Sequence, residues 1–222
     1  MDRPILFSGP MVRALWDNSK TMTRRILKPQ PTAVGTTMLG DAEISNADWQ
    51  ARTMRASPIK HNVGDRLWVR EAYRLDSQLD AVRPAEMSAY EPVHYEADGI
   101  VRTMSCAMIE AGRLRASMHM PRWASRITLI VTGVKVERLQ DIPNEDAIAE
   151  GVFYWAGDLA NDPKTSAIDI EQMIADTGER PGSPRAGFAA LWQSVNGPGA
   201  WGANPYVAAY TFTAHRANID HL

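Results

Sequence analysis

The strongest pattern in the sequence is an alternation of apolar and polar residues between Ser125 and Ile142, in the stretch SRITLIVTGVKVERLQDI. A period of two places alternate side chains on one face of a β-strand. The apolar positions on either side of a central Thr-Gly pair are Ile127, Leu129, Val131, Val134 and Val136. The pair itself, Thr132-Gly133, interrupts the alternation and is typical of a bulge or a tight bend. A long strand needs partner strands, so the chain must contain a β-sheet.

Similar patterns predict further strands. The stretch VGDRLWVREAY, residues 63–73, alternates and predicts a strand with Leu67 and Val69 facing the core. The side chains expected to face outward in that strand are Arg66, Trp68 and Arg70. The other predicted strands are residues 23–28, 93–96, 100–104 and 206–213.

Three helices carry start and stop signals. The first follows Ser8 and Pro10 and ends near Asn18, and a second follows Pro143 and ends at Gly151. The third spans residues 183–197 and has an apolar stripe made of Phe188, Leu191, Trp192 and Val195. Helices and strands in this order predict an α+β fold whose mostly antiparallel sheet curls into a partly open barrel, because curling hides sheet edges.

Composition excludes several classes of function. The 24 Lys+Arg against 26 Asp+Glu give a net charge of −2, so the protein is not a polycation that coats nucleic acid indiscriminately. A single cysteine excludes an intrachain disulfide framework, and the five histidines lack the i, i+4 pairing of a metal site, so we predict no metal and no cofactor. No signal peptide or membrane-spanning stretch is apparent, which predicts a cytoplasmic protein without a membrane partner.

Four segments of the chain share features with a known family. They are ILFSGPMVRALWDNSKTMTRR, VGDRLWVREAY, HMPRWASRITLIVTGVKVERLQDIPNEDAIAEG and LWQSVNGPGAWGANPYVAAYTF. Together they resemble the ASCH-domain proteins of phages and prophages, which belong to the PUA-like superfamily. The resemblance implies one domain over residues 1–222, a PUA-like, partly open β-barrel with flanking helices. Loop-rich insertions at about 30–62, 74–118 and 152–182 separate the matched segments.

The family includes RNA-binding modules, proteins that cut RNA, and amidohydrolases that remove acyl groups from N4-acylated cytidines. The amidohydrolase branch carries Lys-Thr-x-Thr after its first helix and a glutamate in the helix after the long strand. The corresponding residues here are Lys20-Thr21-Met22-Thr23 and Glu150, whereas Asn18-Ser19 replaces the Gly-Arg that usually precedes the lysine. The resemblance therefore implies an amidohydrolase acting on a modified nucleoside, with a non-catalytic RNA-binding or RNA-cleaving module as the alternative.

Hydrolysis of an exocyclic amide needs a nucleophile and a group that takes and returns a proton. Thr23 is the candidate nucleophile, or it positions the attacking water, and Lys20 is the candidate base. Glu150 is expected to orient Lys20 or relay the proton, so that the two act as one coupled pair. Lys20 and Thr23 are an odd number of residues apart, so they converge only if Lys20 still lies in the turn before the strand.

Each of these residues also has a purely structural interpretation. Lys20 follows a helix, where a cation stabilises the carbonyl end of the helix dipole. Thr21 and Thr23 are ordinary strand residues, and Glu150 is typical of a solvated carboxylate on an exposed helix face.

The arginines suggest a binding surface for a modified nucleoside or single-stranded RNA. Arg24 and Arg25 follow the motif directly, and Arg122 stands next to Trp123. Together with Arg70 they suit phosphate contacts combined with base stacking. The same composition is equally typical of the outside of a small barrel, where arginine stems cover apolar surface.

Overall fold

A computed structural model describes residues 1–30, 59–161 and 167–222. Most of the first predicted insertion, residues 30–62, lies outside the described residues, and so does the short helix expected near residues 48–54. The described chain folds as two compact units. Unit one comprises Met1–Thr21, Gly64–Val131 and Phe212–Leu222, and unit two comprises Met22–Val63 and Thr132–Thr211.

The strands form a mixed five-stranded sheet in the order β1-β3-β7-β8-β2 and a three-stranded sheet in the order β4-β5-β6. The five strands of the first sheet are β1 (Asp2–Leu6), β2 (Met22–Ile26), β3 (Arg66–Arg70), β7 (Thr128–Arg138) and β8 (Tyr206–His215). The three strands of the second are β4 (Tyr73–Arg74), β5 (Val93–Tyr95) and β6 (Val101–Arg102). The α+β class is therefore confirmed.

The sheet order ends at β1 and at β2, and within the described residues these two edge strands do not pair, so the sheet is not a closed barrel. The curling of the sheet into a partly open barrel stays a prediction. The sheet is also mixed, because β1 pairs in parallel with β3 while β3 pairs antiparallel with β7. Strand β1 was not predicted, since Pro4 lies inside it. Proline is tolerated there because an edge strand leaves one row of backbone groups unpaired.

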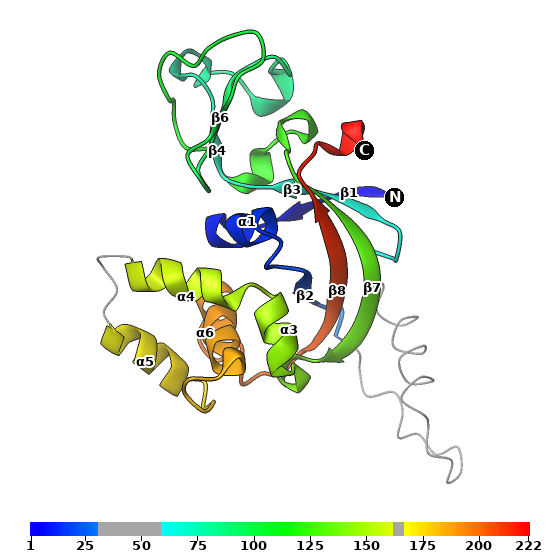
Figure 1. The fold of residues 1–222 in the computed structure, drawn as a ribbon, viewed down its shortest axis with the longest axis vertical. Helices are drawn as coiled ribbons and strands as arrows, with labels where there is room; N and C mark the ends of the chain where they lie inside the picture. The colour runs from blue at the N-terminus through cyan, green and yellow to red at the C-terminus, as the bar shows by residue number, and fades with distance from the viewer. Residues whose placement is uncertain (31–58, 162–166) are drawn as a thin grey trace. The chain divides into compact units, whose positions relative to one another are not determined.

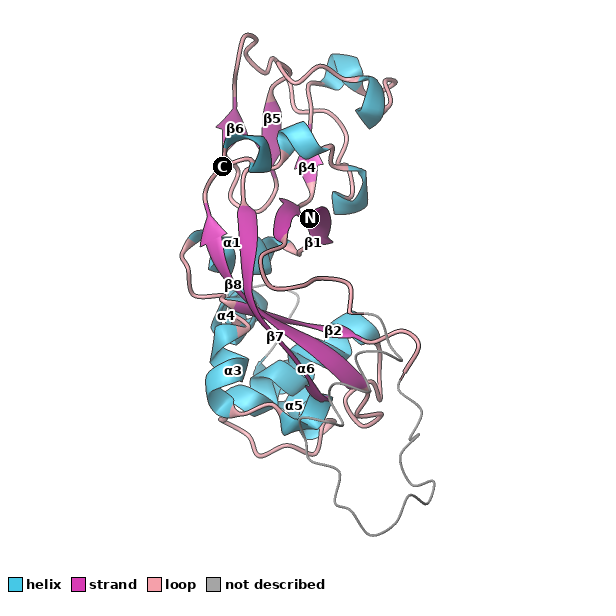
Figure 2. Cartoon of the chain, turned by 90° about the vertical axis from the view of Figure 1, so that its right-hand side faces the viewer, coloured by secondary structure: helices cyan, strands magenta, loops and turns pink. Residues whose placement is uncertain are grey.

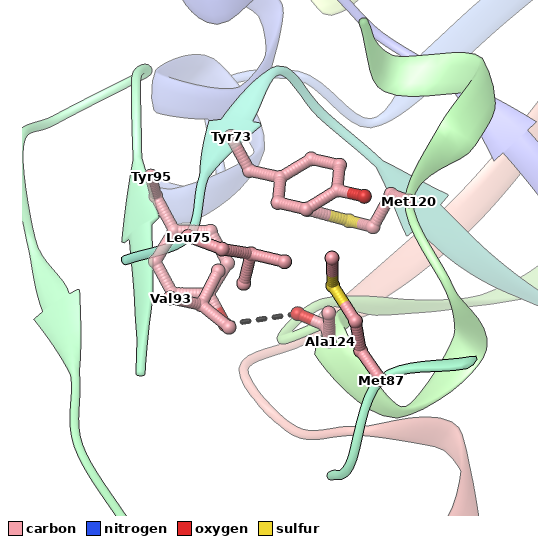
Figure 3. Close-up of a cluster of buried hydrophobic side chains, with 7 residues drawn as sticks. All are labelled: Tyr73, Leu75, Met87, Val93, Tyr95, Met120 and Ala124. Carbon is pink, nitrogen blue, oxygen red and sulfur yellow. Dashed lines mark hydrogen bonds between the residues drawn. The ribbon is translucent and has the colours of Figure 1, made fainter. Parts of the chain in front are cut away.

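Unit one contains helix α1 (Gly9–Trp16) and a chain of short 3-10 helices. These are η1 (Ser77–Leu79), η2 (Pro84–Glu86), η3 (Ser117–His119), η4 (Arg122–Ala124) and η6 (Ile219–His221). The predicted loop-rich insertion 74–118 has an apolar cluster of its own, drawn in Figure 3, whose buried members include Leu75, Met87 and Val93. Tyr95 closes the cluster by donating its hydroxyl hydrogen bond to the Ala124 carbonyl at 2.8 Å.

One predicted orientation in unit one is wrong. Trp68 was expected to face outward from β3, but its side chain is buried, with a residue exposure of 6%. The guanidinium of Arg70 lies 4.4 Å from the Trp68 ring centroid and covers it. An arginine stem can shield an aromatic face while its charged end stays polar, and simple alternation does not reveal this arrangement.

The described part of unit two contains β2, the greater part of β7 and β8, η5 (Leu139–Asp141) and four helices. The helices are α3 (Asn144–Ala149), α4 (Val152–Asn161), α5 (Ala167–Ala175) and α6 (Pro184–Asn196). Helix α6 contacts the other three, and Figure 1 shows this helical group on one side of the strands. Figure 2 shows the same helices behind β2 and β7. The predicted loop-rich stretch 152–182 thus contains the helices α4 and α5, and both of them contact α6.

The capping signals of unit two are confirmed. The Ser183 hydroxyl accepts a hydrogen bond from the Ala186 amide at 3.1 Å and begins α6, and Gly197, with φ 96°, ends it. Val195 was expected on the apolar stripe of α6, yet it is 71% exposed, because it lies in the last turn. Strand β7 includes Thr132 and Gly133, and the bulge or bend expected there stays a prediction. In the three described ranges, no helix is both long enough and apolar enough to cross a membrane.

Candidate functional site

The densest group of charged side chains in unit two surrounds Arg24. Its side chain has no solvent exposure, and its guanidinium donates to three carboxylates. The Nε group donates to Glu137 at 2.9 Å, Nη1 donates to Glu150 at 3.1 Å, and Nη2 donates to Asp146 at 2.6 Å. The ring centroid of Phe188 on α6 lies 5.9 Å from the guanidinium carbon. We call Arg24 and its three acids, together with Lys135, the Arg24 cluster.

Local structure explains why these side chains meet. Asp146 lies in the first turn of α3 and Glu150 is the C-cap residue of the same helix, four positions later. Residues four apart in a helix share one face, so both carboxylates point the same way. Lys135 and Glu137 are two residues apart on β7 and therefore also share a face. The Lys135 ammonium lies 2.6 Å from Asp146 and 3.1 Å from Glu137.

The electrostatics favour the charged forms in this cluster. Burial alone would lower the pKa of Arg24, but Glu150, Glu137 and Asp146 outweigh it and raise that pKa. Burial would raise the pKa of Asp146, yet the hydrogen bonds from Lys135 and Arg24 hold it below its ordinary value. The pKa of Lys135 is raised, because its two carboxylate partners outweigh its burial. Arg24, Lys135 and Asp146 are therefore held in their charged forms.

Thr23 lies on β2 beside Arg24 and is 1% exposed. Its partner across the β2–β8 pair is Tyr210, whose ring centroid lies 5.2 Å from that of His61. Burial raises the pKa of Tyr210, while hydrogen bonds from the backbone amides of Lys60 and His61 act in the opposite direction. Cross-strand partners lie on the same face of a sheet, whereas successive residues lie on opposite faces. The side chains of Thr23 and Tyr210 therefore share one face, and Arg24 lies on the other.

Arg25 is half-buried and shares the Thr23 face. Desolvation lowers the pKa of Arg25, and the charges of Glu150 and Tyr210 act against that change. An arginine stays protonated at physiological pH even after such a shift. Glu150 therefore interacts electrostatically with both arginines of the Arg24-Arg25 pair, and it is itself only 4% exposed. The solvated interpretation of Glu150 is wrong.

Lys20 belongs to unit one, where it follows α1. Its amide donates to the Ala14 carbonyl at 3.0 Å, so its backbone completes the end of that helix. Its side chain is not solvated, since the residue is 2% exposed and Nζ lies 5.6 Å from the Phe7 ring centroid. Thr21 is exposed, and its carbonyl accepts a hydrogen bond from the Phe212 amide at 3.0 Å.

The remaining predicted binding residues lie in unit one and have different environments. Arg122 forms ion pairs with Asp2 at 2.8 Å and Asp220 at 2.5 Å, which raise its pKa. Trp123 is half-buried against the cluster of Figure 3, and the guanidinium carbon of Arg102 lies 5.2 Å from its ring centroid. Arg70 donates to the Met118 carbonyl at 3.0 Å. Of these residues, Arg122 has its charge fully compensated by acids, as Arg24 does in unit two.

The sequence analysis singled out Arg24 as a contact for RNA or a nucleoside and Glu150 as the partner of Lys20, but it did not predict that Arg24 and Glu150 bind each other. It did not single out Asp146, Lys135 or Glu137. The spacing of Asp146 and Glu150, with an acid at each end of one helical turn, was the available signal.

The cluster offers an oriented carboxylate on Glu150, which can accept a hydrogen bond or a proton. Among the residues that the structure describes, no group of three or more His, Cys, Asp or Glu side chains is arranged to hold a metal ion. Comparison of the sequence and structure with protein-family models, curated proteins and solved structures found no match.

Proposed function

We propose that the protein is an ASCH-type, PUA-like amidohydrolase that acts on N4-acylated cytidine or a related modified nucleoside, without a metal. Lys20, Thr23 and Glu150 carry the reaction. The observation that supports the proposal best is their burial: the three residues are 2%, 1% and 4% exposed. Buried polar side chains cost free energy, so chains retain them chiefly where they serve packing networks or chemistry. A phage or prophage origin remains a prediction of the resemblance, and a cytoplasmic location remains a prediction of the sequence, in which no signal peptide is apparent.

The proposed role of each residue depends on its burial. A lysine becomes a base only when desolvation disfavours its ammonium form. A threonine hydroxyl withdrawn from bulk water is a better-positioned nucleophile. Glu150 is fixed by Arg24 at 3.1 Å, so its second carboxylate oxygen is held in a defined direction.

The reaction follows from these roles. The Thr23 hydroxyl attacks the acyl carbon while Lys20 accepts its proton, and the tetrahedral intermediate then expels the N4 amine. Lys20 and Glu150 act together to return the proton to that amine, which releases cytidine. Water then cleaves the acyl-threonine ester by the same proton transfers and releases a carboxylic acid. The net reaction consumes one water for each amide broken.

Incubation of the protein with N4-acetylcytidine in EDTA, followed by chromatography for cytidine, tests the proposal. We expect turnover that is lost in Lys20→Ala and Glu150→Gln, each checked for intact folding by circular dichroism. Thr23→Ser should retain more activity than Thr23→Ala, because serine keeps the hydroxyl. The control Thr21→Ala changes the exposed threonine of the same motif and should retain hydrolysis.

Two results would overturn the assignment. Absence of cytidine from several N4-acyl substrates, together with salt-dependent binding to single-stranded RNA, would make the chain an RNA-binding module. Loss of turnover in EDTA, restored by a divalent metal, would show that the reaction depends on a metal ion.

A further inference from the structure

An open surface pocket of about 380 Å³ lies wholly within unit one, and no residue of the Arg24 cluster lines it. Its walls come from the end of β3, from η2 with its preceding residue, and from the segment that joins η3 to η4. The lining residues are Arg70, Arg83, Pro84, Ala85, Met118, His119, Met120 and Pro121. They include two arginines and a histidine and no acid, so the cavity has a cationic lining.

Arg70 has unused hydrogen-bonding capacity. Its Nη1 donates to the Met118 carbonyl at 3.0 Å, but its Nε is buried and has no hydrogen-bond partner among the described residues. A guanidinium has five N–H donors, and buried donors are normally satisfied. Arg126, two residues before β7, shows how a buried arginine is usually paired. Its guanidinium donates to both carboxylate oxygens of Glu71 at 2.8 Å. Arg70 is half-buried and pairs with no acid among the described residues, so the donors of its guanidinium other than the buried Nε remain for a ligand.

The geometry of the cavity is fixed by contacts behind it. The Arg70 guanidinium stacks on Trp68, with 4.4 Å between its central carbon and the ring centroid, so its plane is held. Tyr73 donates to the His119 carbonyl at 3.0 Å, and Met120 is buried in the apolar cluster of Figure 3. On the opposite wall, Arg115 donates to the Leu79 carbonyl at 2.8 Å and to the Val82 carbonyl at 3.3 Å, directly before Arg83. Because these contacts hold the lining residues in place, the site is preorganised for a ligand.

Arg83 supplies a second cation at the rim. Its side chain is exposed and makes no ion pair or hydrogen bond with the described part of the chain. Pro84 follows it at the start of η2 and restricts the backbone from which the side chain extends. Arg83 can thus turn toward an anion without giving up an existing contact.

We propose that this cavity binds a phosphate monoester attached to an organic group. Two guanidinium groups and an imidazole are the side chains that proteins use for phosphate recognition. The cavity is too large for a bare phosphate, since cavities of roughly 300 Å³ and above suit complete small ligands. The walls formed by Met118, Pro84 and Pro121 offer apolar contact to the organic group. This inference concerns binding in unit one and does not depend on the proposed hydrolysis.

Isothermal titration calorimetry with cytidine 5′-monophosphate, cytidine and inorganic phosphate tests the proposal. We expect saturable binding of the monophosphate that is at least about tenfold tighter than binding of either part alone, because charge-assisted hydrogen bonds and apolar contact are both needed. Arg83→Ala changes an exposed residue and should weaken binding about tenfold without affecting folding. Arg70→Lys keeps the positive charge but loses the paired N–H donors of the guanidinium, so it should also weaken binding about tenfold.

The matched control is Arg113→Ala. Arg113 is an exposed arginine of the same unit that does not line the cavity, so its replacement removes one positive charge elsewhere. Its effect on affinity should stay within about twofold. Equal losses in the Arg83 and Arg113 variants would overturn the proposal, because they would indicate general charge attraction. Equal affinity for cytidine and its monophosphate would also overturn it.

A trinucleotide distinguishes a free nucleotide from an RNA end as the source of the phosphate. Competition by the 5′-phosphorylated form, but not by the unphosphorylated form, supports the monoester site and assigns it to an RNA end. Competition by both forms would contradict a site specific for phosphate monoesters. Each of these experiments measures a binding constant. The protein can therefore bind the monophosphate as proposed even if it does not hydrolyse N4-acetylcytidine.

Discussion

Asp146 and Glu150, one turn apart at α3, both accept hydrogen bonds from the guanidinium of Arg24. The helix therefore brings two carboxylates to one arginine, and Glu137 of β7 brings a third. Because the guanidinium is fully buried, removal of the arginine leaves like charges close together in a poorly hydrated place.

Replacement of Arg24 should destabilise the protein strongly. We expect Arg24→Ala to lower the free energy of unfolding by about 3–5 kcal/mol, since a buried ion pair that loses one partner leaves uncompensated charge. Arg24→Lys should lower the free energy of unfolding by less, because lysine keeps the positive charge although it lacks the paired N–H donors of a guanidinium. Urea denaturation measures both. The control Arg180→Ala, at an exposed arginine of unit two, should change stability by less than about 0.5 kcal/mol. A cost below about 1 kcal/mol for Arg24→Ala would contradict this account.

The pH dependence of stability should carry a contribution from Asp146. Its folded-state pKa lies below the ordinary value of 3.8, so its ionised form is favoured in the folded protein. The corresponding stability is present above 3.8 and is lost as the pH falls through the folded-state pKa. Asp146→Asn should therefore flatten the acid limb of a plot of unfolding free energy against pH. Asp141→Asn, at an exposed residue of η5, should leave that limb unchanged, and equal flattening in both variants would refute the assignment.

The hydroxyl of Tyr95 should matter to stability because it satisfies a buried carbonyl. Tyr95→Phe keeps the ring but leaves the Ala124 carbonyl without that donor, which should cost about 1–3 kcal/mol. Thermal and urea unfolding measure the change. Tyr90→Phe is the matched control, because Tyr90 is 62% exposed and the substitution removes a hydroxyl on the protein surface. Similar costs for the two variants would indicate that the hydrogen bond contributes nothing specific.

Glycine-to-alanine changes on either side of the start of α4 should have opposite signs. Gly151 separates α3 from α4 and has φ 79°, where a Cβ is strained, so Gly151→Ala should cost about 1–2 kcal/mol. Gly157 lies inside α4, where an added Cβ meets nothing within 4 Å, so Gly157→Ala should add about 0.5–1 kcal/mol. Chemical denaturation compares the two. Stabilisation by Gly151→Ala would show that the left-handed conformation is not required there.

Local signals in the sequence were sufficient to predict much of the fold. The alternation in β7, the capped helix α6 and the acid-rich start of α3 each depend on neighbours within a few residues. Strand β1 was missed because it contains Pro4, and the burial of Trp68 was missed because Arg70 supplies the cover. These outcomes depend on tertiary contacts, which periodicity does not encode.

The candidate site was predictable only in part for the same reason. The Lys-Thr-x-Thr motif drew attention to β2, and a helix-end glutamate suggested Glu150. The role of Arg24 as the ligand of Glu150 joins residues 126 positions apart, and no local pattern contains that information. A cluster of arginines suggested contact with phosphate, whereas Arg24 is bound by the protein's own acids.

The Arg24 cluster also protects β2 against slippage along β8. On β2, Met22 and Ile26 share the Arg24 face, so a shift by two positions would keep every side chain on its original side. Apolar patterning alone would tolerate such a shift. The carboxylates forbid it, since they would then face methionine or isoleucine in place of a guanidinium. One buried charge therefore selects a single alignment for an edge strand that hydrophobicity would leave ambiguous.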